Sequence, residues 1–177
     1  MTTTYRISVF CSDNVGLVSA ITGRLFDLGA NLGDTTFSVL GTGAEFTAVC
    51  DVPDMVGAAE IKEQLQSLEF LEDADITVAA FKLSSIQGPK ANITHHISVK
   101  GRDNPGLVAR LTEVFVEFNA NIVRLNSSKI LGEEGDQYLI NFAVWIPESS
   151  ADACLATIAN TASTLQMKCD SEPVTSE

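Results

Sequence analysis

The sequence predicts an α+β fold in which two similar domains follow one another along the chain. A segment of the first half recurs 90 residues later. Within each half, apolar residues alternate with the period of a strand and then recur with the spacing of a helix, in the order βαββαβ. The 177 residues, 45% of them hydrophobic, are enough for two small domains.

The internal repeat is clearest around one loop. Residues 13–18 read DNVGLV and residues 103–108 read DNPGLV, and the same shift of 90 aligns residues 30–32 with residues 120–122. Agreement over such a length indicates an internal duplication. Further along, the shift becomes 94, which matches residues 52–53 with residues 146–147. The second copy therefore carries about four additional residues, which we place near 132–136 in a polar hairpin tip, where added length costs little.

The repeat also suggests the domain limits. We expect a first domain over residues 1–83, a linker over 84–91, a second domain over 92–171 and a flexible tail over 172–177. The linker contains the sequence SSIQGPK, and its Gly-Pro pair is typical of a boundary.

The first strand and helix of each copy follow from the apolar pattern. Tyr5, Ile7, Val9 and Cys11 alternate with the residues between them, which predicts a strand with these four side chains on the core face. From Leu17 to Leu28 the spacing becomes helical. The matching helix of the second copy carries apolar residues at Leu107, Val108, Leu111, Val114, Phe115 and Phe118. We expect Asp13 and Asp103 to cap these helices and Pro105 to lie in a first turn.

The remaining elements complete a βαββαβ order. Strands over 32–40 and 45–52 are joined by Gly41-Thr42-Gly43, which suits a hairpin turn. A second helix over 58–68 and a last strand over 76–81 follow, and residues 151–165 form the matching helix of the second copy. With right-handed crossovers, this order gives an antiparallel four-stranded sheet with two helices on one face.

Composition excludes several functional classes. The formal charge of -12 argues against direct nucleic-acid binding, which depends on Lys and Arg. No apolar run approaches a membrane span, and the start of the chain lacks a signal-peptide pattern, so we expect a cytoplasmic protein. The four cysteines form no CxxC motif or Cys/His cluster. We therefore interpret them as reduced core residues and expect neither a metal site nor a cofactor.

The duplicated loop is the first candidate for binding. It joins the end of a strand to the start of a helix, where free N–H groups and the helix dipole favour a carboxylate, such as that of an amino acid. Gly16 and Gly106 let a ligand approach the backbone, and Asn14 and Asn104 offer both donors and acceptors. The alternative is an ordinary helix start with a turn-forming glycine. Asn31 and Asn121 follow the first helix of each copy. Each is either a ligand-binding residue or an asparagine that tolerates the left-handed backbone conformation common at helix ends.

The motif Asp-Asn-Pro-Gly-Leu-Val, followed about a dozen residues later by Asn-Ala-Asn-Ile, resembles the ACT domain. The resemblance covers nearly the whole chain and implies two tandem ferredoxin-like ACT domains. In ACT domains the effector usually lies at an interface between two domains, against the loop after strand one and the residues after helix one. The ligand-binding residues implied here are Asp13, Asn14, Gly16, Leu17, Asn31, Leu32, Asp103, Asn104, Pro105, Gly106, Leu107, Asn121 and Ile122. The first copy departs from the pattern, because Val15 replaces Pro and Gly33 follows Leu32.

Two copies with nothing attached resemble the glycine cleavage system transcriptional repressor family. That resemblance implies a regulator without catalytic residues, which binds glycine or a similar amino acid and controls transcription as a repressor through a DNA-binding or metabolic protein partner. It also implies a homo-oligomer such as a dimer. An exposed edge strand would let copies join their sheets, with Lys129 and Arg124 limiting less specific pairing. Phe37 and Leu125 are either pocket walls or ordinary core or interface residues.

Two other functional classes remain open. An acylphosphatase-like hydrolase shares the βαββαβ order and uses an Arg and an Asn around a phosphate-binding loop, but Arg24 and Arg110 fall within the predicted helices. An interaction module that binds no metabolite would use the same loops only as helix starts. His95 and His96 are adjacent on a strand and so point to opposite faces, which disfavours a shared metal ion. The deformylase of formyltetrahydrofolate also has an ACT segment, but its catalytic domain has no counterpart here.

Overall fold

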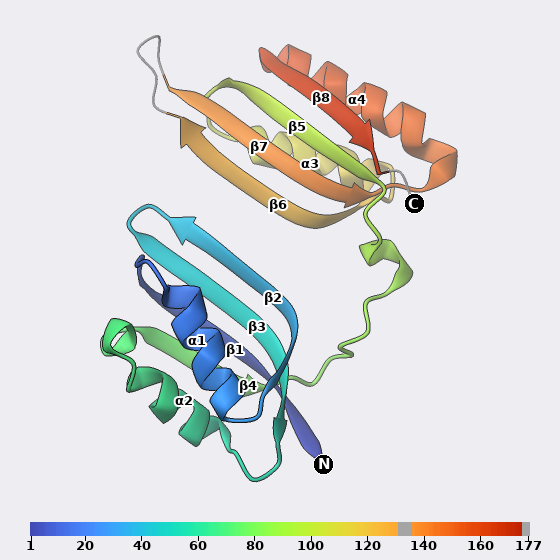
Figure 1. Ribbon diagram of the computed structural model, residues 1–177. Helices are drawn as coiled ribbons and strands as arrows, with labels where there is room; N and C mark the ends of the chain where they lie inside the picture. Colours follow the sequence, from blue (N-terminus) through green and yellow to red (C-terminus); the bar gives the residue numbers. More distant parts are fainter. Residues whose placement is uncertain (131–135, 175–177) are drawn as a thin grey trace. The chain divides into compact units, whose positions relative to one another are not determined.

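The computed structural model describes residues 1–130 and 136–174, and it divides into two compact units, Met1–Ile86 and Gln87–Glu177 (Figure 1). The first unit contains β1 (Thr2–Ser12), α1 (Leu17–Asp27), β2 (Asn31–Leu40), β3 (Gly43–Pro53), α2 (Ala58–Gln66) and β4 (Asp75–Ala80). The second contains β5 (His95–Arg102), α3 (Leu107–Glu117), β6 (Asn121–Ile130), β7 (Gln137–Trp145), α4 (Ala151–Thr164) and β8 (Met167–Pro173). Short 3-10 turns lie at Glu69–Leu71, Pro89–Ala91 and Glu148–Ser150.

Each unit is a βαββαβ domain with a four-stranded antiparallel sheet. The strand orders are β2-β3-β1-β4 and β6-β7-β5-β8, so the two sheets have the same topology. Figure 1 shows the two helices of each unit on a single face of its sheet. The predicted α+β fold with two copies of one domain is therefore confirmed.

The predicted alternation along the first strand correctly identifies the core face. Ile7 and Val9 of β1 are completely shielded from solvent and pack under α1 with Leu17, Ile21 and Leu25. This arrangement follows from the period of two in a strand and of 3.6 in a helix, which place every core residue on one side of its element. The other face of each sheet carries no helix.

The two cores are filled differently at equivalent positions. In the first unit, Ile7 lies opposite Ala48 in the β1–β3 register, whereas in the second unit Ile97 lies opposite Phe142. Phe142 meets Phe115 of α3 edge to face, with the ring centroids 5.2 Å apart. Equivalent positions of the two domains thus hold side chains of different size. This is expected, because the total volume of a core matters more than the identity of each of its residues.

The structure places the additional residues of the second copy in its hairpin. Leu40 and Ile130, which end β2 and β6, are 90 residues apart, while Gly43 and Gln137, which begin β3 and β7, are 94 apart. Residues 132–135 of the expected tip lie outside the described residues. At the other end, β8 runs to Pro173, so Glu172 and Pro173 are strand residues and not part of the expected tail.

The expected side-chain caps of α1 and α3 are wrong. The residues before the helices are Gly16 and Gly106, with φ of 88° and 84°, and neither helix start receives a side-chain hydrogen bond. Asp13 and Asp103 stand three residues earlier, and the left-handed glycine turns the chain between them and the first helical turn. Pro105 precedes this glycine and so lies before the helix, not in its first turn.

Candidate functional site

The loop between the first strand and the first helix has the same backbone in both units. Gly16 and Gly106 adopt left-handed conformations, and the space that a side chain at either position would enter is empty to 4 Å. Glycine is therefore required here by the backbone, and its small size also keeps the helix start open. In the second unit, the N–H groups of Val108 and Ala109 have no acceptor among the described residues. These two donors lie in the first turn of α3, the end of a helix that favours an anion.

The second unit has a hollow of about 230 Å³ at this loop. Residues 103–109 form one side of it, and Lys129 of β6 and Tyr138 of β7 form the other. The Lys129 ammonium lies 2.6 Å from an Asp103 carboxylate oxygen. The hydrogen bond to Asp103 raises the pKa of Lys129 above its ordinary value. The Tyr138 hydroxyl donates a hydrogen bond of 2.8 Å to Ser127 Oγ. The hollow thus combines a cation, an anion and free N–H donors.

The first unit lacks the two additional side chains. Lys129 and Tyr138 are paired across the β6–β7 hairpin, and the equivalent pair in the β2–β3 hairpin is Val39 and Ala44. The loop of the first unit therefore faces no cation from its hairpin. Sequence analysis missed Tyr138 and interpreted Lys129 only as an edge charge. The reason is that the longer second hairpin changes the alignment between the two halves of the chain. The two shifts of 90 and 94, applied on either side of the hairpin, would have paired them.

The candidate residues that follow the first helix lie far from the loop of the same unit. Asn31 is opposite Asp51 on β3, which is opposite Thr4 near the start of β1, whereas the loop begins after Ser12. Eight residues of strand correspond to about 26 Å. Asn121 is displaced in the same way, beside Trp145 at the far end of the second sheet. Within one unit, the structure does not bring the two groups of predicted site residues together.

Asn121 is engaged by the segment that precedes the second domain. Its side-chain N–H donates a hydrogen bond of 2.8 Å to the carbonyl oxygen of Lys90. The Lys90 ammonium in turn lies 3.3 Å from Asn119 Oδ1 and 5.5 Å from the centroid of the Trp145 ring. Asn31 has no such neighbour among the described residues. The two equivalent asparagines therefore have different surroundings.

The other predicted site residues are placed as follows. Leu17 and Leu107 are buried under the sheets, and Leu32 and Ile122 are partly exposed on the edge strands. Asn14 and Asn104 are exposed at the loops, and the side-chain N–H of Asn104 donates a weak hydrogen bond of 3.5 Å to the Arg102 carbonyl oxygen. Both asparagine side chains are thus available to a ligand.

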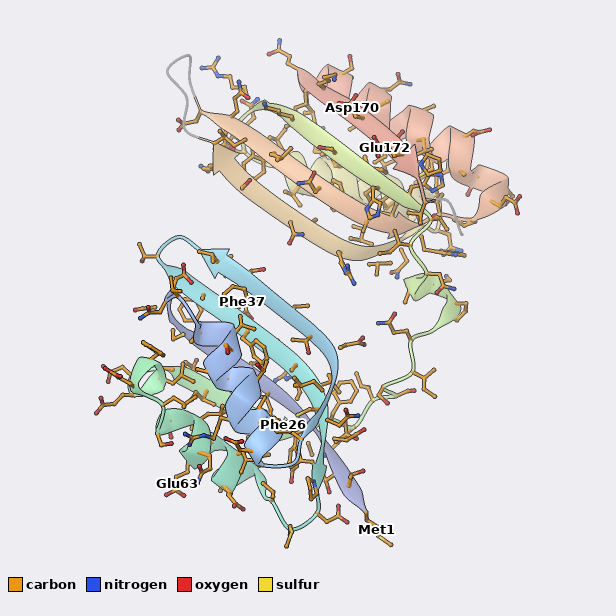
Figure 2. All side chains as sticks on the ribbon, viewed as in Figure 1. Met1, Phe26, Phe37, Glu63, Asp170 and Glu172 are labelled. Carbon is orange, nitrogen blue, oxygen red and sulfur yellow. The ribbon has the colours of Figure 1, made fainter. Side chains whose placement is uncertain are left out.

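Phe37 and Leu125, which sequence analysis left between pocket and core, are 40% and 38% exposed on the edge strands β2 and β6. Figure 2 shows Phe37 on β2, the outermost strand of the first sheet. Both side chains share the core-facing side of their strands, but they lie at the edge of the sheet, where solvent reaches them. The edge strands β2 and β6 therefore each carry an apolar side chain that a strand from another molecule would cover.

The arginine and histidine side chains that were considered for phosphate or metal binding make ordinary structural contacts or are exposed to solvent. Arg24 donates from Nη1 to the carbonyl and side-chain oxygens of Gln64 and to Ser67 Oγ, and so ties α1 to α2 away from the loop. His95 Nδ1 lies 2.9 Å from Thr94 Oγ1, while His96 is exposed on the opposite face, as predicted. Over residues 1–130 and 136–174, no three His, Cys, Asp or Glu side chains cluster as metal ligands.

The cysteines are free thiols, and three of the four are buried. Burial raises the pKa of Cys50 and of Cys154 to about 11 in each case, and the Asp51 carboxylate adds to the effect at Cys50. A thiol with a raised pKa is a poor nucleophile at neutral pH. These residues belong to the cores, as predicted.

No protein-family profile and no curated protein sequence matches this chain. Among solved structures, an unknown protein from Galdieria sulphuraria is similar over 99% of this chain and 100% of its own, with 22% identity and a TM-score of 0.77. A protein described as a candidate glycine cleavage system transcriptional repressor is similar over 99% of both chains, with 13% identity and a TM-score of 0.65. These full-length likenesses confirm the tandem ACT fold. None of the helices in the described residues is long and apolar enough to cross a membrane.

Proposed function

We propose that this protein is a cytoplasmic, non-catalytic regulator that senses a free amino acid, and that the loop of the second domain is its principal binding site. The observation that supports this most directly is the hollow of about 230 Å³ in which the Asp103–Lys129 pair lies beside the free N–H groups of Val108 and Ala109. A free amino acid carries an anion and a cation on neighbouring atoms, and this set offers a partner to each.

The ligand is held in the following way. Its carboxylate accepts hydrogen bonds from the N–H groups of Val108 and Ala109 and pairs with the Lys129 ammonium, and its ammonium pairs with the Asp103 carboxylate. The Lys129 side chain is 62% exposed, so the existing pair contributes little stability and opens at small cost. The Asn104 side chain supplies a further donor and acceptor. Because the first unit has Val39 in place of Lys129, its loop binds more weakly or not at all.

A second copy of the chain completes the site. Antiparallel pairing of two β6 edges would set the start of one strand beside the end of the other, because β-strands paired in this way run in opposite directions. Asn121 of one copy would then approach the loop of the other, which spans the separation of about 26 Å that a single domain leaves open. The exposed apolar side chains of Leu125 and Ile130 on β6 would be covered by this pairing. We therefore propose a homo-oligomer.

Regulation then passes to another protein. The net charge of -12 disfavours contact with nucleic acid, so the amino-acid signal would reach transcription through a DNA-binding or metabolic protein partner. The likeness to the candidate glycine cleavage repressor supports glycine, or an amino acid of similar size, as the ligand and repression as the outcome. A first domain over 1–83 and a second domain that begins at 92 remain part of this proposal, whereas the expected end at 171 is replaced by the end of β8 at Pro173.

Thermal unfolding of the full chain against each common amino acid tests the proposal. A ligand that binds only the folded protein stabilises it by RT ln(1 + [L]/Kd), or about 2.7 kcal/mol at a hundredfold excess over Kd. We expect one amino acid or a small group to raise the midpoint, and Asn104→Ala and Lys129→Met each to abolish most of the shift. Asn14→Ala, the same change in the first domain, is the matched control and should keep it.

A chain that responds to no amino acid would contradict the sensor and favour the ligand-free interaction module. A response that Asn14→Ala removes and Asn104→Ala keeps would assign the site to the first domain instead.

A further inference from the structure

The helix-free face of the second sheet carries two rows in which all but one of the residues are polar. In the strand register, one row runs Arg124, Ala143, His96, Glu172 and the next runs Asn126, Asn141, Ser98, Asp170, in each case from β6 through β7 and β5 to β8. Their neighbours Ile97 and Phe142 point into the core, so these side chains point away from the helices. The rows enclose a shallow hollow of about 420 Å³.

Opposite charges lie at opposite edges of this face. Arg124 is on β6, and Asp170 and Glu172 are on β8, where Figure 2 labels them. Three strand spacings separate these edges, or about 14 Å, which is too far for an ion pair within one chain. Among the described residues, Asp170 forms an ion pair only with Lys168, at 3.0 Å, and both side chains are exposed. The side chains of Arg124 and Glu172 have no partner in the described part of the chain.

The same face of the first sheet lacks this pattern. The equivalent rows contain Val49, Arg6 and Ala79, with Asp34 of β2 at the position of Arg124, and Thr36, Thr47, Ser8 and Thr77. Within the second row, Thr47 and Ser8 share a hydrogen bond of 3.3 Å between their hydroxyl oxygens. The β4 edge carries Ala79 and Thr77 where the β8 edge carries Glu172 and Asp170. Opposite charges at the two edges are therefore found on the second sheet and not on the first, so the fold does not require them and they call for a separate explanation.

We propose that this face docks on the same face of a second copy, about a two-fold axis that runs along the strands between β7 and β5. Such a rotation exchanges the two edges, so Arg124 of each copy lies over Glu172 of the other and Asn126 lies over Asp170. Each contact therefore occurs twice, as in any isologous interface. The proposal concerns a different surface from the amino-acid loop and does not depend on that site.

The shapes and remaining charges of the face agree with this docking. The axis places His96 of one copy over Ala143 of the other, and the small alanine side chain leaves room for the imidazole. In the following row, the register sets Lys100 beside Leu139 on one side and Lys168 on the other. The rotation puts Lys100 over Leu139 and Lys168 over Ser128, so no like charges meet. Repulsion between the acidic chains is thus opposed by complementary pairs at close range.

The area of the face sets the strength of the dimer. Four strands at 4.8 Å by roughly seven residues at 3.3 Å give about 450 Å² per copy. A standard protein–protein interface buries about 800 Å² per partner, so this contact belongs to the weak, reversible class. We therefore expect a micromolar dissociation constant that rises with salt, since the pairs are screened.

A charge exchange between the two edges tests the docking. The mass of the full chain is measured by sedimentation equilibrium at micromolar concentrations in low salt. Arg124→Glu and Glu172→Arg should each weaken this association at least about tenfold, because each replaces two attractions with two repulsions. The double variant R124E/E172R should restore it. Arg110→Glu, the same charge change at an exposed position on α3, is the matched control and should have no effect.

The restoration separates this contact from all others. Residue 172 on β8 cannot repair a pairing defect at the β6 edge, and it cannot reach residue 124 of its own chain. A monomeric wild type, or single variants that associate as the wild type does, would overturn the proposal. A double variant that associates as weakly as the single variants would also overturn the proposal. That result is the one expected if the hollow binds a small ligand instead of a second copy. The thermal response to amino acids should persist in Glu172→Arg, so this proposal and the sensor can fail independently.

Discussion

Backbone conformation explains individual residues that composition leaves unexplained. Gly16 and Gly106 have φ of 88° and 84°, and Gly29, which follows α1, has φ of 76°. In the second unit, the position of Gly29 is taken by Asn119, with φ of 52°. Asn is the residue other than glycine that best tolerates this region. The two helices therefore end in the same left-handed turn with different residues.

One substitution at two glycines tests this interpretation. Gly106→Ala should lower the free energy of unfolding by about 1 kcal/mol, because an alanine in the left-handed region is strained. Gly23→Ala, at an exposed position inside α1 with open space around it, should raise it by up to about 1 kcal/mol. Urea denaturation of both variants measures the difference. Changes of the same sign would show that backbone strain is not the reason for glycine at 106.

At the scale of elements, the start of β6 is joined to the connector that precedes β5. The Asn121 side chain binds the Lys90 carbonyl oxygen, and the Lys90 ammonium reaches Asn119 and the face of Trp145. Lys90 is exposed, and a cation over an aromatic ring at an exposed site contributes about 0.5–1 kcal/mol. The connector thus competes for the same side chain that the ACT resemblance assigns to a ligand.

Asn121→Ala distinguishes a structural role from a purely ligand-binding one. Without any amino acid present, loss of this hydrogen bond should free the connector and speed tryptic cleavage after Lys90 several-fold, since it removes about 0.5–1.5 kcal/mol of local stability. Asn31→Ala, the equivalent change in the first domain, should leave the rate unchanged. Gel electrophoresis over a time course provides the measurement. Equal rates for both variants and the wild type would show that Asn121 does not hold the connector.

At the scale of the whole molecule, the chain has two separate hydrophobic cores. One is formed by residues of the first unit around Phe46, and the other by residues of the second unit around Phe115 and Phe142. No described residue belongs to both clusters. Each domain should therefore unfold as its own cooperative unit, because cooperativity follows shared packing.

The single tryptophan makes this separation measurable. Trp145 lies on β7, so its fluorescence reports the second domain, whereas circular dichroism reports both. Phe142→Ala should cost the second domain about 3–5 kcal/mol and shift the fluorescence midpoint in urea to lower concentration. Phe46→Ala should leave the fluorescence midpoint in place and shift only part of the dichroism signal. A fluorescence midpoint that moves equally in both variants would contradict independent domains.

The sequence by itself determined the order of elements, the core faces and the location of the two loops. The periodicity of residues such as Ile7, Val9, Leu17 and Ile21 is a local property, and burial of apolar surface makes each element turn that side inward. The duplication reinforced these predictions, because each copy checks the other. The expected Asp caps failed because a left-handed glycine between the aspartate and the helix is a three-dimensional feature that the residue types do not disclose.

Only the tertiary structure decided which distant side chains meet. Asp103 pairs with Lys129, and Asn121 with the Lys90 carbonyl oxygen, because hairpin length and sheet register bring these positions together. The rows that set Arg124 and Glu172 at opposite edges of one face likewise exist only once four strands are aligned. A register shift of one residue would turn every one of these side chains to the other face. Contacts across a sheet depend on that register, which is set by the packing of the whole domain.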